Sequence, residues 1–531
     1  MIFPNSTLPF PGVALLALLA LGGCVRANFA QPDARLPAQA ATPLPAGADS
    51  ITGTAGRQYN EHGGLYRAWL GKHYRRVWAA PVRVPVLDLA TAAPGGLTPD
   101  HMGGGYQSIS LTLTDPAGRE YALRALDKEP SKTLPKALRS TFLLNAVRDA
   151  TSAANPYAAL TVPPLAAAAG VPHSHPRLVY IRPDATNLGE GSARFQGKLA
   201  QLEEKFEGPA DLTPDLAGAR TALDSDDMLE NIYKSPAYRI DQPEFLRARL
   251  LDLLIGDWDR HEGQWQWAEY ALPDGQVRYR GIPKDRDQVY YRFDDGVVPW
   301  VAAHLIAPKF QTFGPKYGNM VGLVAQAEFI DQRGLLRLTR ADFQRTARDL
   351  QTRLTDAVLD SAARRLPPAV YALEGELLRR NLRARRDKLP AAAEKFYEVL
   401  ARRPVLGGSE RGDRFVVRRG PDSTTVAIYS PRTGPPVPGD SLRYRRTFYS
   451  AETKRITLEG IDGTDVFEVH STSGRGIKLA IYGGKDDDAV LVSGPSRDID
   501  FYDDADDASG SALRTRKVPK KHKPYDREED G

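Results

Sequence analysis

Residues 246–265 read LRARLLDLLIGDWDRHEGQW, and the rest of the chain is organised around this stretch. Its first half has leucines at helical spacing, and Asp241 followed by Gln242-Pro243-Glu244 provides an N-cap with proline in the first turn. The apolar pattern then stops, and residues 259–264 are almost all polar or glycine. We therefore expect a helix that ends in a loop at the edge of a core, where catalytic groups are commonly placed.

The polar side chains of this loop have a spacing that fits phosphoryl transfer. A kinase catalytic loop needs a carboxylate that accepts the hydroxyl proton and, five residues later, an amide oxygen that holds a metal ion. Asp259 and Gln264 have this spacing. Residues 275–293, GQVRYRGIPKDRDQVYYRF, then alternate as a strand does and continue into Asp285-Arg286-Asp287. A carboxylate at the end of that strand would supply a second metal ligand.

These two segments together resemble known kinase families. DRHxxN is the catalytic-loop pattern of phosphatidylinositol kinases, and IGDWDRH followed by PKDRD resembles atypical kinase-like proteins of the spore-coat CotH type and, more distantly, the secretory-pathway kinases. The resemblance implies that Asp259 is the catalytic carboxylate, Asp285 the leading metal ligand and Asp287 its close alternative. It also implies Mg²⁺ or Mn²⁺ and ATP or another nucleotide. Gln264 stands where the pattern has Asn, and its extra methylene leaves its role as a metal ligand open.

Two other interpretations compete with an active kinase. Residues 256–260, GDWDR, resemble the GDxxDRG motif of calcineurin-like phosphoesterases, but they are one residue short and the accompanying Asp-x-His and Gly-Asn-His motifs are absent from the sequence. A dinuclear metal site would therefore lack most of its ligands. The other alternative is a catalytically inactive pseudokinase that binds partners in the cell envelope, because the envelope is poor in ATP.

The segment before the loop predicts a nucleotide-binding hairpin. Gly103-Gly104-Gly105 precedes two alternating segments, 108–114 and 121–128, joined by a turn at 115–118. A glycine-rich turn lets backbone amides approach phosphates, and a basic residue on a following strand can grip them. Arg124 and Lys128 are both candidates, and we favour Arg124 because it lies within the strand. Asp149, on the next predicted helix, is the candidate acidic partner of that base.

The N-terminus predicts a bacterial lipoprotein. Residues 13–21, VALLALLAL, form a short apolar run, and Leu21-Gly22-Gly23-Cys24 resembles a lipobox whose cysteine would receive the lipid. Cys24 is the single cysteine of the 531 residues. We therefore expect a signal peptide over 1–24, a flexible tether over 25–55 and a membrane anchor through lipid at Cys24. Val25 after the cysteine favours the outer membrane over the inner one. The net charge of +5 does not indicate nucleic acid.

The remaining sequence completes an α+β prediction. Residues 56–405 would form a two-lobed kinase-like domain, with an N-lobe over about 80–185 and a C-lobe over about 186–405 whose arginine-rich helix near 387 presents a solvated basic face. Residues 411–502 would form a small all-β module, solenoid- or sandwich-like, in which Asp465 and Asp488 repeat 23 residues apart. Their turns faintly resemble calcium-binding nonapeptide repeats, but we expect structural turns rather than bound calcium. Residues 503–531 would be a disordered charged tail.

Overall fold

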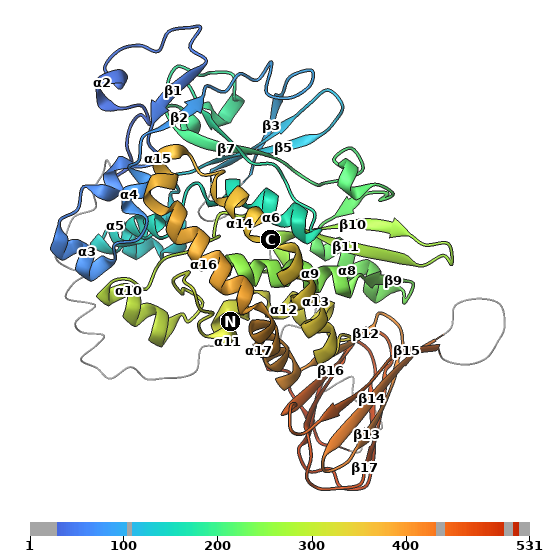
Figure 1. The fold of residues 1–531 in the computed structure, drawn as a ribbon. Helices are drawn as coiled ribbons and strands as arrows, with labels where there is room; N and C mark the ends of the chain where they lie inside the picture. Colours follow the sequence, from blue (N-terminus) through green and yellow to red (C-terminus); the bar gives the residue numbers. More distant parts are fainter. Residues whose placement is uncertain (1–28, 104–108, 432–440, 504–512, 520–531) are drawn as a thin grey trace.

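The computed structural model describes residues 29–103, 109–431, 441–503 and 513–519. Helices and antiparallel sheets make up the larger part of the chain, and a β-rich module lies at its C-terminal end (Figure 1). The predicted α+β class and β-rich C-terminal region are therefore confirmed. The predicted signal peptide and Cys24 lie outside the described residues. Within the described ranges, no helix combines the length and the apolar character needed to cross a membrane.

The first sheet contains the predicted hairpin. Its five strands pair antiparallel in the order β3-β4-β5-β7-β6, with Ser110 opposite Arg124 in the hairpin itself. The turn is held by Asp115, whose Oδ1 accepts the backbone N–H groups of Ala117 and Arg119 at 2.8 and 3.0 Å. The strands are β3 (Thr98–Gly103), β4 (Ser110–Thr114), β5 (Glu120–Ala125), β6 (Arg177–Tyr180) and β7 (Leu199–Glu204). Gly104 and Gly105 lie outside the described residues.

The central helix is α9 (Gln242–Ile255), and it is buried on nearly every side. Asp241 caps it as predicted, because its side chain accepts the backbone N–H of Glu244 at 3.3 Å. The helix ends at Gly256, which has the left-handed φ of 68° that favours glycine. The other helices of this part are α3 (Gly64–Leu70), α4 (Arg75–Trp78), α5 (Phe142–Asp149), α6 (Val162–Ala169), α7 (Ser192–Phe195), α8 (Ser225–Lys234), α10 (Val297–Val301), α11 (Met320–Val324) and α12 (Glu328–Gly334).

A second, four-stranded sheet is built from two strands that precede α9 in the chain and two that follow it. The hairpin of β10 (Trp265–Ala271) and β11 (Val277–Pro283) pairs antiparallel, with Trp265 opposite Pro283. β8 (Ala222–Leu223) and β9 (Tyr238–Ile240) flank it in the order β8-β10-β11-β9. Trp265 and Trp267 are fully buried, and both rings contact Phe245 of α9. This packing places the start of β10 and the end of β11 beside the end of α9.

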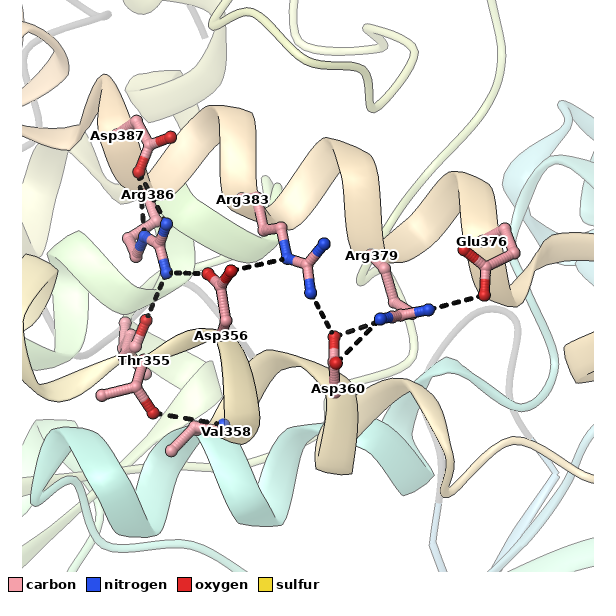
Figure 2. Close-up of polar contacts among 10 residues, drawn as sticks. Thr355, Asp356, Val358, Asp360, Glu376, Arg379, Arg383, Arg386 and Asp387 are labelled. Carbon is pink, nitrogen blue, oxygen red and sulfur yellow. Dashed lines mark hydrogen bonds and ion pairs between the residues drawn. The ribbon is translucent and has the colours of Figure 1, made fainter.

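The predicted C-lobe continues with α13 (Arg340–Arg353), α14 (Asp356–Ala363), α15 (Pro368–Val370), α16 (Glu376–Asp387) and α17 (Leu389–Arg402). Of these, α13, α16 and α17 pack against α9. The predicted basic face is partly exposed to solvent, and its arginines pair with acids of α14 (Figure 2). Asp360 accepts Arg379 at 2.7 and 2.8 Å and Arg383 at 2.9 Å. The two helices are therefore joined by a ladder of ion pairs.

The C-terminal module consists of two five-stranded sheets packed over an apolar core. Several strands run parallel with a 23-residue offset, since Arg455 pairs with Lys478 and Val466 with Ala489. The sequence repeat therefore corresponds to successive coils. One sheet has β12 (Val405–Ser409), β16 (Arg455–Ile461), β18 (Lys478–Gly484), β20 (Ile499–Tyr502) and β21 (Thr515–Arg516), and the other has β13 (Arg414–Arg419), β14 (Ser423–Ser430), β15 (Ser441–Tyr449), β17 (Val466–Ser471) and β19 (Ala489–Ser493).

Four boundaries differ from the prediction. β7 belongs to the first sheet, although the predicted N-lobe ends near 185, and β12 belongs to the C-terminal module, whose predicted start is 411. Residues 29–55 are not a flexible tether, because β1 (Ser50–Gly53) pairs with β2 (Val82–Pro85) and Ala34 is fully buried. Helix α2 (Pro37–Ala40) also lies in this segment. At the other end, β21 lies within the predicted disordered tail, where it pairs with β20. Composition suggested a tether and a tail, but a few apolar side chains and backbone pairing were enough to order these residues.

Candidate functional site

The predicted catalytic loop begins at the C-terminal end of α9, which is held in place by hydrogen bonds. After Gly256, the backbone N–H of Asp257 donates to the carbonyl of Asp252 at 2.9 Å. The last carbonyls of α9 are satisfied by Arg385, whose guanidinium donates to Leu253 at 2.6 Å and to Leu254 at 2.8 Å. A buried helix end needs such donors, because its final carbonyls have no partner within the helix. The loop therefore leaves a helix end that cannot fray.

A buried ion-pair network then joins the loop to the segment after β11. Arg286 donates to Asp257 at 2.8 Å and also pairs with Asp252. Arg260 donates to the carbonyl oxygens of Lys284 and Gln264, each at 2.7 Å. Since Asp259 precedes Arg260, and Asp285 and Asp287 flank Arg286, this network sets the relative positions of all three candidate carboxylates.

The candidate carboxylates meet a lysine from the first sheet. Lys128, just beyond β5, forms an ion pair with Asp287. Burial disfavours the charged form of Lys128, but the carboxylates of Asp287, Asp285 and Asp259 outweigh it and raise the lysine pKa. Side chains from the two sheets therefore converge at one place, although the chain separates Lys128 from Asp287 by 159 residues.

Asp285 and Asp287 are held in different electrostatic states. Burial opposes the ionisation of Asp285, yet Arg124, Lys128 and Arg260 lower its pKa. Burial and the charge of Asp285 raise the pKa of Asp287 to about 6, in spite of its ion pair with Lys128. Asp285 also has a left-handed φ of 55°, which is uncommon outside glycine and recurs at functional sites.

Gln264 has an amide oxygen available for a ligand. Its Oε1 is buried and has no hydrogen-bond partner among the described residues, and its Nε2 lies 3.4 Å from Nε2 of His261. A buried acceptor without a donor is costly, and a cation would satisfy it. The role of Gln264 as a metal ligand stays a prediction.

The structure favours Lys128 over Arg124 as the base that reaches the carboxylates. Arg124 is instead paired with Glu203 of β7, whose other oxygen accepts Ser174 at 2.7 Å. Asp149, the predicted acidic partner of this base, contacts neither candidate. Its carboxylate receives Arg75 through two hydrogen bonds of 2.6 Å. Glu203 is thus the acid that the sequence did not point to, because its partner lies 79 residues away.

Further residues around Asp259 were not identified from the sequence. Gln326 donates to Asp259 at 3.5 Å, and Lys309 lies 4.9 Å from the Trp258 ring. Burial lowers the pKa of Lys309, while the charge of Asp259 opposes that shift. Tyr291 packs against Trp258 with 5.6 Å between ring centroids. Asp259 therefore lies in a half-buried setting that combines an aromatic wall with a second lysine.

Among the described residues, no group of three His, Cys, Asp or Glu side chains is arranged to hold a metal ion. Mg²⁺ in phosphoryl-transfer sites commonly takes only one or two carboxylates, and substrate phosphates and waters complete its shell. The assignment of Asp285, Asp287 and Gln264 as metal ligands stays a prediction.

The aspartates of the C-terminal repeat have a structural role. Asp465 accepts the backbone N–H of Asp413 at 2.6 Å, and Asp488 accepts that of Asp465 at 2.7 Å. Each of these carboxylates therefore ties one coil of the module to the next.

Comparison of the chain with protein-family models and with curated proteins gave no match. The resemblance to kinases thus rests on the short motifs at 256–264 and 283–287. Beside these motifs the structure brings Lys128 to Asp287, where the charges of Asp285 and Asp259 also act on the lysine. None of these contacts follows from local sequence alone.

Proposed function

We propose that the chain is a lipid-anchored, kinase-like protein of the bacterial cell envelope, held in the outer membrane through Cys24. In this proposal it binds a nucleotide together with Mg²⁺ or Mn²⁺ and transfers phosphate. The observation that carries the proposal is that Lys128, which follows β5, meets Asp287, which follows β11. The carboxylates of Asp285 and Asp259 also act on this lysine. Phosphoryl transfer depends mainly on positioning and on charge stabilisation, and a lysine opposite clustered carboxylates supplies both.

Each side chain has a distinct role in this proposal. Lys128 would bind nucleotide phosphates, and Asp285, Asp287 and Gln264 would hold the cation, which neutralises phosphate charge when bound. Asp259 would accept the proton of the attacking hydroxyl. Asp259 suits this role because it is half-buried and, among the described residues, its carboxylate accepts a single long hydrogen bond of 3.5 Å, from Gln326.

The ion pair between Lys128 and Asp287 supports an exchange of partners on binding. Both groups are charged or readily ionised, and they lie where the segment after β5 meets the segment after β11. A bound nucleotide and cation would give Lys128 a phosphate partner and Asp287 a metal partner, so neither group would be left unpaired. Arg124 would remain with Glu203 and contribute its charge rather than a direct contact.

A pseudokinase scaffold is the second candidate function. It is favoured by the same ion pair, because a lysine that neutralises Asp287 can stabilise the fold without any ligand. It is also favoured by Gln264 in place of Asn. In this case the β-rich module would bind envelope partners, and the kinase-like region would serve only to position it.

Thermal unfolding with and without ATP and MnCl₂ separates these functions. The parent protein should be stabilised, by about 2.7 kcal/mol when ligand is at a hundred times its dissociation constant. Asp285→Asn and Lys128→Met should abolish the shift. Asp274→Asn is the matched control, because Asp274 lies in the exposed turn at the far end of the same β10–β11 hairpin and should leave the shift intact.

A phosphotransfer assay then distinguishes binding from catalysis. Asp259→Asn should retain the nucleotide-dependent shift and lose turnover, because Asp259 is assigned to the proton and not to the nucleotide. A parent that binds nucleotide without turnover would support the pseudokinase. A parent that shows no shift, or a shift that survives in Asp285→Asn and Lys128→Met, would refute the proposed site.

A further inference from the structure

Two neighbouring helices turn apolar side chains toward solvent. They are α3 and the continuous helix formed by α10 and the π-helical turn η9 (Ala302–Ile306). We call these side chains the apolar face, and they include seven of the twelve most exposed large apolar residues in the described part of the chain. The apolar face consists of Leu65, Trp69, Val297, Trp300, Val301, Leu305 and Ile306.

These helices expose apolar side chains to solvent, whereas an ordinary surface helix exposes polar ones. Residues 297–306, VVPWVAAHLI, contain no Asp, Glu, Lys or Arg. The exposed positions recur every three or four residues, so they form one stripe. Leu65 is 77% exposed and Leu305 71% exposed. A contiguous apolar patch of this kind on a folded protein marks a surface that contacts something apolar.

The apolar face is rigid. Gly71 ends α3 and Gly296 precedes α10, and a Cβ added to Gly296 would lie 2.2 Å from the backbone nitrogen of Gly71. The backbone N–H of His73 also donates to Asp295 at 2.7 Å. The two helices therefore lie side by side at one edge of the molecule, at a distance from the β-rich module (Figure 1). No rearrangement is needed to present both at once.

We propose that the apolar face docks the protein onto the surface of a lipid bilayer. Trp side chains favour the boundary between headgroups and acyl chains, and helices with an apolar stripe lie in that plane. Trp69 and Trp300 are each about half exposed, at 49% and 50%. The exposed cations Lys72, two residues after α3, and Arg76, in α4, would face anionic headgroups. The nearby Asp295 is already paired with His73.

The start of the described chain lies close to this face. The Phe29 ring is 5.8 Å from that of Tyr59, and the carbonyl of Tyr59 accepts Arg75 at 3.2 Å. Arg75 in turn lies over the ring of Tyr66 in α3. Cys24 precedes Phe29 by five residues, a reach of roughly 17 Å. The orientation of the apolar face toward the membrane thus rests on the proposed lipidation of Cys24, whereas its affinity for lipid does not.

Vesicle binding of the full chain carrying Cys24→Ser tests the apolar face without the lipid. The vesicles would contain phosphatidylethanolamine and phosphatidylglycerol with brominated acyl chains, which quench tryptophan fluorescence on contact. We expect quenching in this protein and none after Trp69→Phe and Trp300→Phe. The four remaining tryptophans, Trp78, Trp258, Trp265 and Trp267, are buried and cannot reach the lipid.

A second variant keeps the tryptophans and weakens the contact. Leu65→Ser with Leu305→Ser should lower the partition onto vesicles by roughly tenfold, because two exposed leucines leave the interface. Leu491→Ser, which changes a leucine that is 49% exposed on β19 of the β-rich module, should leave the partition unchanged. Equal partition of these two variants would overturn the proposal, because it would assign any binding to residues 13–21.

Two further outcomes keep this inference separate from the proposed function. A protein that forms dimers in solution, and loses them through Leu65→Ser and Leu305→Ser, would assign the apolar face to a second copy and overturn the proposal. A Cys24 that carries no lipid in cells, as measured by mass spectrometry, would refute the anchor but leave vesicle binding in place. Nucleotide-dependent stabilisation should be the same with or without the two leucine substitutions.

Discussion

Arg260 and Lys284 are joined by a hydrogen bond of 2.7 Å from the guanidinium of one to the backbone carbonyl of the other. This bond connects the loop that carries Asp259 with the segment that carries Asp285. Arg260 is fully buried and also lies near Asp252 and Asp257, at 3.5 and 3.7 Å. The same side chain thus balances buried charge and fixes the distance between two halves of the proposed site.

Arg260→Met should destabilise the protein by about 3–5 kcal/mol, because it leaves buried carboxylates with one cation fewer. Urea unfolding at neutral pH measures the change. Arg345→Met is the control, since Arg345 is largely exposed and pairs only with Asp342 on its own helix. A variant at Arg260 that unfolds at the same urea concentration as the Arg345 variant would show that the network carries little stability.

Asp127 makes stability depend on pH. Tyr59 and Gln58 donate to its carboxylate at 2.6 and 3.0 Å, but burial dominates and raises its pKa from 3.8 to about 6. Between pH 3.8 and about 6, Asp127 is therefore protonated in the folded protein and ionised in the unfolded chain. The stabilising contribution is complete below about pH 4 and is lost as the pH rises through 6, in total roughly 1–3 kcal/mol.

Asp127→Asn should remove that contribution to the pH dependence. The free Oε1 of Gln58 can accept the new amide after a side-chain flip, so the hydrogen bonds can be kept. Unfolding free energies of parent and variant, measured from pH 4 to pH 8, should differ most at the high end, where the variant is the more stable. A constant difference across this range would contradict the assigned shift.

Asp465 should be neutral at physiological pH. Burial is the main cause that raises its pKa to about 10, and the charges of Asp488 and Asp413 add to the effect. Asp465→Asn should therefore leave stability at pH 7 within about 1 kcal/mol of the parent. Asp465→Ala should cost about 1–3 kcal/mol, because it leaves the backbone N–H of Asp413 without its acceptor. Equal loss in both variants would show that the carboxylate is ionised.

The local elements of this fold could be predicted from the sequence, because their signals lie within a few residues. Asp241 caps α9 and Gly256 ends it, and the β4–β5 hairpin follows its alternating pattern. The 23-residue repeat likewise predicted the register of the C-terminal coils. In each case a short-range physical rule, such as capping, alternation or repetition, decides the structure.

The partners of the charged residues could not be predicted in the same way. Position within a strand favoured Arg124 over Lys128, but Glu203 on the neighbouring strand takes Arg124 and leaves Lys128 to meet Asp287. Asp149 similarly pairs with Arg75, far back in the chain. Such pairs depend on how sheets and helices pack together. Only the tertiary structure shows which of several nearby bases and acids meet.

The ion pairs between α14 and α16 should contribute little to stability and should weaken in salt. Asp360 is partly exposed and accepts Arg379 and Arg383 along the ladder of Figure 2. Because solvent screens such pairs, Asp360→Asn should cost about 1 kcal/mol or less in dilute buffer. In about 1 M NaCl, where screening acts over roughly 3 Å, the cost should fall toward zero.

Arg385→Met, on the same helix α16, provides the contrast. Arg385 is buried and donates to the carbonyls of Leu253 and Leu254, so its loss removes donors from groups that water cannot reach. We expect a loss of about 2–4 kcal/mol that salt does not change. Urea unfolding of both variants at low and high NaCl measures this. A salt-sensitive loss of stability in Arg385→Met would contradict the buried role assigned to Arg385. A large salt-independent loss in Asp360→Asn would contradict the screened surface role assigned to the ion pairs of Asp360.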